Sequence, residues 1–328
     1  MGKQRIFSGI QATGSLHLGN YLGAIRNWVK MQFEYDNYFC VVDLHTITVP
    51  QDPQILRANI REVAGLLFAA GIAEENSVVF IQSHVKAHSE LAWLLNCITP
   101  MGWLQRMTQF KEKSEKQKED VSVGLFDYPV LQAADILLYD TNLVPVGEDQ
   151  KQHVELCRDI AQRFNYRYGE IFVLPDVYIP PIGGRVMGLS NPDKKMSKSE
   201  EKKDEAIFLL DSPEEIRLKI QRATTDSLRV IGFDDKRSGI NNLLTIYQLL
   251  TEKTREQIEE HFVGKSYKDL KEELAEVIIG SLHPLQERYR EITGEKGYLD
   301  KMLNRGAERA GDYAERKLQM ILKHIGLR

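Results

Sequence analysis

The sequence predicts an α/β protein: a Rossmann-type, doubly wound parallel sheet with a helical insertion, followed by an all-helical C-terminal domain. In the first part of the chain, short β-rich runs alternate with amphipathic helical patterns, which is typical of parallel strands joined by crossover helices. From about residue 204 onward the periodicity is helical, without a convincing strand pattern. We therefore expect a catalytic sheet domain over residues 1–203, with the insertion at about 84–134, and a helical domain over residues 204–328.

The sheet domain begins with a βαβαβ order of elements. The patterns predict strands at residues 5–8, 38–42, 77–82 and 143–146, and helices at 18–32, 55–70 and 148–164. Residues 88–134 are helical in pattern, interrupted by Pro100 and by a mixed-charge run at 111–120. Further helices are predicted at 213–223, 241–250, 267–291 and 298–325. In a sheet of this kind, ligands bind outside the carboxyl ends of the strands.

The overall composition is that of an ordinary soluble globular protein. A net charge of -4 over 328 residues gives no general attraction to polyanions, so any contact with nucleic acid must be local. Cys40, Cys97 and Cys157 are odd in number and lack Cys-x-x-Cys spacing, which favours reduced thiols. Because the sequence also has neither an apolar signal region nor a membrane-length apolar run, we expect a cytoplasmic protein.

A glycine-punctuated turn at residues 9–23 follows the first predicted strand and opens a helix. Gly14, Gly19 and Gly23 let a ligand approach the backbone, and the helix start offers unpaired N–H groups to an anion. The spacing is neither the dinucleotide fingerprint nor the phosphate-loop motif, which argues against NAD enzymes and P-loop NTPases. The turn predicts a nucleotide platform. A simple tight turn, with His17 as a capping or packing residue, is the alternative.

A basic segment at residues 193–200 contains three lysines and two serines within six residues and follows Gly183, Gly184 and Pro192. This composition predicts a mobile loop whose ammonium and hydroxyl groups suit phosphates. A solvated surface turn is the alternative.

Together these segments resemble a known family. His17-Leu-Gly-Asn20 and Lys195-Met-Ser-Lys-Ser199 resemble the two signatures of class I aminoacyl-tRNA synthetases. Within that class the chain is similar to the tryptophanyl-tRNA synthetases, on the runs Phe7–Gln11, Arg106–Lys113, Tyr128-Pro129, Ala133–Leu137 and Val144–His153. The resemblance covers the catalytic part and, more loosely, the C-terminal part.

The resemblance implies an ATP-dependent ligase that activates L-tryptophan and transfers it to the 3′-terminal ribose of its tRNA. Such chemistry needs donors that stabilise charge on the phosphates in the transition state, and no protein nucleophile. The implied catalytic residues are His17, Asn20, Lys111, Lys113, Lys195 and Lys198. The implied further ATP contacts are Gln11, Ala12, Thr13, Gly19, Gly147, Glu148, Asp149, Val186, Met196, Ser197 and Ser199. Mg²⁺ is expected with ATP, without a dedicated protein metal site.

The implied tryptophan site centres on Asp135, a carboxylate in an apolar helical run where burial is costly. The resemblance implies that Asp135 accepts the indole N–H; a purely structural partner role is the alternative. The other implied pocket residues are Phe7, Gly9, His45, Tyr128, Gln132, Val144, Val146 and Gln150. Gln132 stands where many bacterial relatives carry methionine, which leaves open whether it also reads the indole or holds Asp135. Ala12 replaces a common proline.

The resemblance also implies two partners, the tRNA for tryptophan and a second copy of the chain, but no DNA and no membrane. Candidate tRNA contacts in the C-terminal part are Lys253, Arg255, Arg305, Arg309 and Arg316. The apolar helix at 88–98, with Trp93 and Leu94, is a candidate dimer surface. Two other functions stay open: a tyrosine-specific ligase, against which the run from Gly147 to His153 argues, and a non-ligase protein that binds tryptophan or ATP.

Overall fold

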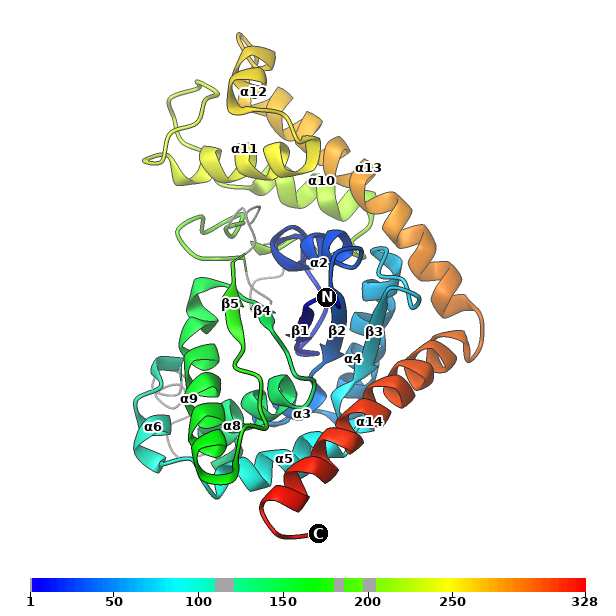
Figure 1. The fold of residues 1–328 in the computed structure, drawn as a ribbon. Helices are drawn as coiled ribbons and strands as arrows, with labels where there is room; N and C mark the ends of the chain where they lie inside the picture. The colour runs from blue at the N-terminus through cyan, green and yellow to red at the C-terminus, as the bar shows by residue number, and fades with distance from the viewer. Residues whose placement is uncertain (1, 110–120, 180–185, 197–204) are drawn as a thin grey trace.

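A five-stranded parallel sheet forms the centre of the molecule, and the predicted fold class is confirmed (Figure 1). The computed structural model describes residues 2–109, 121–179, 186–196 and 205–328. The strand order is β3-β2-β1-β4-β5. The strands are β1 (Arg5–Ile10), β2 (Asp36–Val41), β3 (Ser77–Ile81), β4 (Leu143–Pro145) and β5 (Asp176–Tyr178). The order reverses between β1 and β4, which is where a doubly wound sheet opens a ligand crevice.

The fifth strand was not predicted from the sequence. β5 has three residues and pairs with β4 through Leu143 and Asp176, Val144 and Val177, and Pro145 and Tyr178. Asp176 is exposed and Val177 and Tyr178 are half-buried, so this edge strand lacks a buried apolar residue such as Val144 in the equally short β4.

The helices predicted for the sheet domain occur in the predicted order, and the structure adds the short α3, which was not predicted. α1 (Leu18–Asn20), the π-helical turn η1 (Tyr21–Ile25) and α2 (Arg26–Met31) together occupy the predicted first helix. The others are α3 (Asp43–Thr46), α4 (Pro53–Ala69), η2 (Gln82–His84), α5 (Ala87–Asn96), α6 (Met101–Gln105), α8 (Val123–Leu137), η3 (Glu148–Gln150) and α9 (Lys151–Tyr168). Asp52 caps α4 ahead of Pro53, and Ser122 caps α8, so local capping explains where both helices begin.

The C-terminal part is helical, as predicted, with α10–α12 grouped beyond one end of the sheet and α13 running from this group past α4 towards α14 (Figure 1). Its helices are α10 (Pro213–Arg222), α11 (Ser238–Thr251), α12 (Arg255–His261), α13 (Tyr267–Gly294) and α14 (Tyr298–His324). The short α12 was not predicted, although Thr254 and Gln257 form a capping box that marks its start. Within the described ranges, no helix has both the length and the apolar character needed to span a membrane.

Two hydrophobic clusters lie on opposite faces of the sheet. Along β2, Phe39 and Val41 belong to one cluster, whereas Tyr38 and Cys40 belong to the other. Successive strand side chains point to opposite faces, so both faces of this buried sheet require apolar residues. The first cluster includes residues of α4 and α13, and the second includes residues of α5, α8 and α9.

Helix α14 returns from the C-terminal part and lies along the edge strand β3 (Figure 1). Leu303 belongs to the first cluster and Ala310 to the second, so α14 joins the two layers across this edge. An uncovered edge strand would offer unpaired backbone groups to other chains. Because α14 covers it, the C-terminal part shares its core with the sheet. The predicted division at 203/204 stays a prediction.

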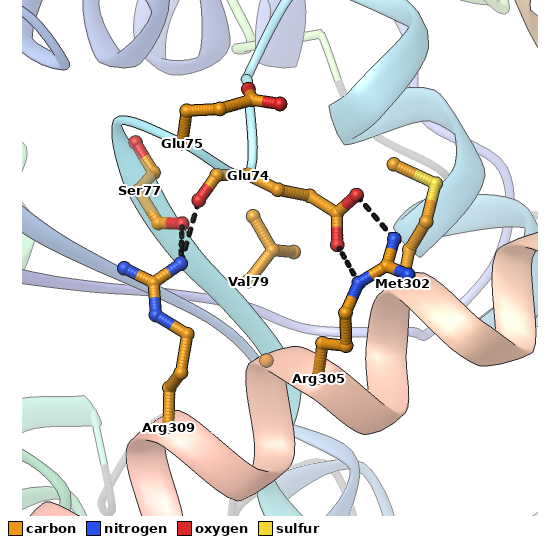
Figure 2. Close-up of a pocket in the computed structure, with 8 residues that line it drawn as sticks. Glu74, Glu75, Ser77, Val79, Met302, Arg305 and Arg309 are labelled. Carbon is orange, nitrogen blue, oxygen red and sulfur yellow. Dashed lines mark hydrogen bonds and ion pairs between the residues drawn. The ribbon is translucent and has the colours of Figure 1, made fainter.

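Two arginines of α14 hold it against the loop before β3 (Figure 2). Arg305 makes a two-pronged contact with the carboxylate of Glu74, at 2.7 and 3.1 Å, and Arg309 donates to the backbone carbonyls of Glu74 and Ser77. The cavity of about 320 Å³ that these residues line is at the amino end of β3, opposite the carboxyl edge where ligands bind. Arg305 and Arg309, both candidate tRNA contacts, are therefore engaged within the chain.

Candidate active site

A cavity of about 370 Å³ opens at the carboxyl ends of β1 and β4, where the strand order reverses. Every residue predicted for the amino-acid pocket lines it: Phe7, Gly9, His45, Tyr128, Gln132, Asp135, Val144, Val146 and Gln150. The segments after β1, β2 and β4 and the inner face of α8 meet here because parallel strands share one carboxyl edge. The structure thus brings together residues that are up to about 140 positions apart in the chain.

Asp135 is the most deeply buried charged group of this cavity, with 1% of its surface exposed. Among the described residues, three side chains donate hydrogen bonds to its carboxylate. His45 Nε2 lies 2.7 Å from Oδ2, Gln82 Nε2 lies 2.6 Å from Oδ1, and His88 Nδ1 also lies 2.6 Å from Oδ1. Gln132 is not among these donors, so in this structure it does not hold Asp135.

The donors explain how a carboxylate is kept ionised here. Burial raises the pKa of Asp135, but hydrogen bonds and the positive potential of His45 and His88 outweigh it and lower the pKa below its usual value. A buried ionised carboxylate is a strong acceptor for a ligand N–H or O–H group.

Aromatic and aliphatic side chains form the rest of the wall. Phe7 stacks on Tyr139 with ring centroids 5.6 Å apart, and Val144 is buried beside it in the same cluster. Gly9 has a steric reason to be glycine, because a Cβ there would lie 2.9 Å from a methyl group of Val42.

The hydroxyl of Tyr128 lies 2.9 Å from His153 Nε2 at the rim of the apolar wall. Burial raises the pKa of Tyr128 to about 12, so it stays a neutral phenol at physiological pH. It can therefore both donate and accept a hydrogen bond, which suits contact with a polar ligand group.

The first signature motif forms the start of the helix after β1. His17 Nδ1 accepts from the backbone N–H of Asn20, and Asn20 Oδ1 accepts from the backbone N–H of His17, which together make a capping box. A Cβ at Gly19 would lie 3.0 Å from His17 Nδ1 and 3.5 Å from Cβ of Met196. Glycine is therefore needed where the imidazole folds over the helix start.

The second signature motif begins next to the first. Met196 is buried in the first cluster, its N–H donates to the Val186 carbonyl, and its side chain lies beside Gly19. Residues 207–209 lie next to the first motif. The backbone N–H of Leu18 donates to the carbonyl of Ile207, and that of Leu209 donates to the carbonyl of Leu16. Lys195 is exposed, pairs with Met187 and directly precedes Met196, so it is one residue from the contact with Gly19. The predicted residues Lys111, Lys113, Ser197, Lys198 and Ser199 lie outside the described residues.

The remaining predicted ATP contacts occupy different positions. Gln11 and Asp149 line the cavity. Thr13 is exposed and follows Gln11 by two residues in the chain. Gly147 and Glu148 lie on the turn into α9, where a Cβ at Gly147 would come within 2.8 Å of Asp149 Oδ1. Ala12 and Val186 are buried in the first cluster.

In the part of the chain that the structure describes, no group of three or more His, Cys, Asp or Glu side chains is arranged to hold a metal ion.

Two residues of the Asp135 network were missed from the sequence. Gln82 lies directly after β3, at the carboxyl edge, and this position was the available signal. His88 lies on α5, outside the cavity lining, and no sequence pattern connects it to Asp135. Ser8, Val42, Gln109, Ile136 and Pro145 also line the cavity and were not predicted as site residues.

Comparisons with known proteins agree with this geometry. Residues 1–283 match the family described as tRNA synthetases class I (W and Y). The tryptophan–tRNA ligase of Wolinella succinogenes is 53% identical over 327 residues, covering 100% of both chains. The chain also resembles the crystal structures of tryptophanyl-tRNA synthetase from Mycoplasma pneumoniae (36% identity, TM-score 0.91, 99% and 98% coverage) and from Campylobacter jejuni complexed with ADP and tryptophan (35% identity, TM-score 0.87, 99% and 100% coverage).

Proposed function

The chain belongs to the family of tRNA synthetases class I (W and Y), and from this premise we propose that it is a ligase specific for tryptophan. It activates L-tryptophan with ATP, giving tryptophanyl-adenylate and pyrophosphate, and then transfers tryptophan to the 3′-terminal ribose of its tRNA. Full-length similarity to tryptophan–tRNA ligases supports this choice over tyrosine.

The buried carboxylate of Asp135, in a cavity that Phe7 and Val144 also line, is the observation that carries the proposal. The indole of tryptophan has one polar group, its N–H, and Asp135 is the buried acceptor for it. The flat ring fits against Phe7 and Val144, while Tyr128 and Gln150 at the rim suit the α-amino group. Phenylalanine has no N–H group for the acceptor position of Asp135 that the indole would use, so the site disfavours it.

The activation step needs charge stabilisation and alignment. The tryptophan carboxylate attacks the α-phosphorus of ATP, an O–P bond forms, and the bond to pyrophosphate breaks. His17, Asn20 and Lys195 stabilise the charge that develops on the phosphates. The sequence motifs assign Lys111, Lys113 and Lys198 to the same task. ATP enters with its own Mg²⁺, which offsets phosphate charge.

Exchange of pyrophosphate into ATP tests this function directly. We expect exchange with tryptophan, and at least about 10³-fold lower kcat/KM with phenylalanine. Exchange driven by tyrosine in place of tryptophan would identify the tyrosine enzyme. No exchange with either amino acid would instead support a non-ligase binding protein.

The tRNA is the second partner in this proposal. With Arg305 and Arg309 tied to the loop before β3, the candidates that remain are Lys253, Arg255 and Arg316. Lys253 and Arg255 lie at the junction of α11 and α12, against the rings of Tyr247 and Phe233 at 5.8 and 4.8 Å. We expect this junction to contact the tRNA through phosphate and base groups.

A homodimer in the cytoplasm completes the proposal. On α5, Leu91 and Leu95 are buried in the core, whereas Trp93 is 69% exposed on the other face. Large exposed aromatics of this kind are typical of interface centres. The three cysteines lack Cys-x-x-Cys spacing and favour reduced thiols, which supports a location in the cytoplasm.

A further inference from the structure

His88 is a buried histidine directly behind Asp135 and outside the cavity lining. Its exposed fraction is 0%, and both ring nitrogens are engaged. Nδ1 lies 2.6 Å from Asp135 Oδ1, and Nε2 lies 2.8 Å from the hydroxyl of Tyr139. Tyr139 is also fully buried and stacks on Phe7 of the cavity wall. The three residues form a line of hydrogen bonds that runs from the core to the site.

The chemistry of these groups decides which of them donates in the hydrogen bond to Asp135. The carboxylate of Asp135 only accepts hydrogen bonds, so His88 Nδ1 carries a proton. Nε2 takes the hydroxyl of Tyr139 as its partner at 2.8 Å. Tyr139 keeps its proton because burial raises the pKa of its phenol. His88 therefore donates to Asp135 through Nδ1, and its Nε2 is held by the hydroxyl of Tyr139.

The donors are divided unequally between the two carboxylate oxygens. A carboxylate has about four acceptor positions, two on each oxygen. Gln82 and His88 both donate to Oδ1, which fills it, whereas His45 alone donates to Oδ2. Oδ2 thus retains one acceptor position, and a rotation of the carboxylate would break both bonds to Oδ1.

We propose that His88, backed by Tyr139, is a positioning residue that locks Oδ1 of Asp135 and leaves the last acceptor position of Oδ2 to read the indole N–H. This rests on the tryptophan specificity proposed above. The inference concerns how Asp135 discriminates, since His88 lies outside the cavity and acts through Asp135.

Two substitutions of His88 separate its two hydrogen bonds. The amide nitrogen of His88→Asn lies near the position of Nδ1, so it keeps a donor for Asp135 and loses Tyr139. The amide of His88→Gln reaches the position of Nε2, so it keeps Tyr139 and loses the donor for Asp135. Tyr139→Phe removes only the hydroxyl and retains the ring that stacks on Phe7.

The measurement is ATP–pyrophosphate exchange with tryptophan and with its benzothiophene analogue, which lacks the N–H. We expect His88→Gln to lower the tryptophan-to-analogue ratio of kcat/KM by about tenfold or more. The reason is that the Asp135 carboxylate is no longer held in the orientation that accepts the indole N–H. His88→Asn should keep most of the ratio, and Tyr139→Phe should lower it by a few-fold.

A purely structural role predicts a different pattern. Equal losses for both substrates in His88→Gln, with an unchanged ratio, would overturn the proposal. If His88→Gln does not fold, as judged by thermal unfolding, Tyr139→Phe decides, and an unchanged ratio in that variant overturns it. Absence of exchange with tryptophan in the wild-type protein would count against the proposed function itself, which separates the two failures.

Discussion

Gly306 of α14 lies directly against the backbone carbonyl of Val79 in β3. A Cβ at position 306 would come within 1.8 Å of that oxygen. Unlike the end of a flexible side chain, a strand carbonyl in the sheet cannot move aside cheaply. The contact therefore requires glycine, and it sets how closely the C-terminal helix approaches the sheet that carries the site.

Gly306→Ala should destabilise the protein although alanine favours helix. We expect the free energy of unfolding to fall by about 1–3 kcal/mol or more, because α14 must move away from β3. Gly311→Ala is the matched control in the same helix, where a Cβ would meet nothing within 4 Å. It should leave stability unchanged or raise it by up to about 1 kcal/mol. Urea unfolding compares the two, and equal effects would contradict the close contact.

Gly19→Ala should damage activation while leaving the fold intact. The new Cβ would press on the His17 ring at 3.0 and 3.1 Å and displace the imidazole from the helix start. Misplacement of a catalytic group by a fraction of an ångström to 1 Å predicts a loss of about tenfold or more in exchange rate. Gly23→Ala, which meets nothing within 4 Å, is the control. A fully active Gly19→Ala protein would argue against a catalytic position for His17.

Lys195→Ala should lower the activation rate far more than it weakens tryptophan binding. A donor that acts on charge developing in the transition state contributes about 10²-fold to kcat. Lys194→Ala is the neighbouring control, since Lys194 is equally exposed and is tied to Gly188 through its backbone carbonyl. Single-turnover kinetics and equilibrium binding of tryptophan measure the two quantities. Equal losses in both would contradict the transition-state role.

Protonation of Asp226 at acidic pH should lower the free energy of unfolding. Hydrogen bonds from Arg237, with a further one from Tyr267, lower the pKa of Asp226 to about 2. Its folded pKa lies below the unfolded value, so its stabilisation is complete above about pH 4 and is lost as the pH falls towards 2. The difference in unfolding free energy between wild type and Asp226→Asn should be constant above about pH 5 and shrink below about pH 4.

The exposed Asp235 provides the control for that titration. Within the described residues it makes no hydrogen bond or ion pair, and it lies in the same segment of the chain. Asp235→Asn should therefore unfold like the wild type at every pH. A pH dependence in Asp235→Asn that matches Asp226→Asn would assign the effect to general charge and not to the contact with Arg237.

Trp93→Glu should shift the protein from dimer to monomer. A charge at the centre of an apolar interface is costly to bury, so association should weaken strongly. Tyr166→Glu is the comparison, because Tyr166 is 92% exposed on α9. Sedimentation velocity at several concentrations separates the two variants. A Trp93→Glu protein that remains dimeric would exclude this face of α5.

Local sequence features were sufficient to predict most elements and the location of the site. β1 and β4, the helices after His17 and Asp52, and the C-terminal helices other than α12 follow from periodicity and capping, which depend on neighbouring residues. The parallel order of strands then predicts that residues after β1 and β4 meet at one edge, as they do around the cavity. β5, an edge strand without a buried residue, left no such pattern.

The sequence by itself determined the order of most elements, the family and the acid that lines the cavity. Only the tertiary structure decided which groups surround that acid. His45, Gln82 and His88 reach Asp135 from three separate segments, and Arg305 and Arg309 turn inward to hold the loop before β3. These contacts depend on strand register and helix packing between distant parts of the chain, which no local periodicity encodes.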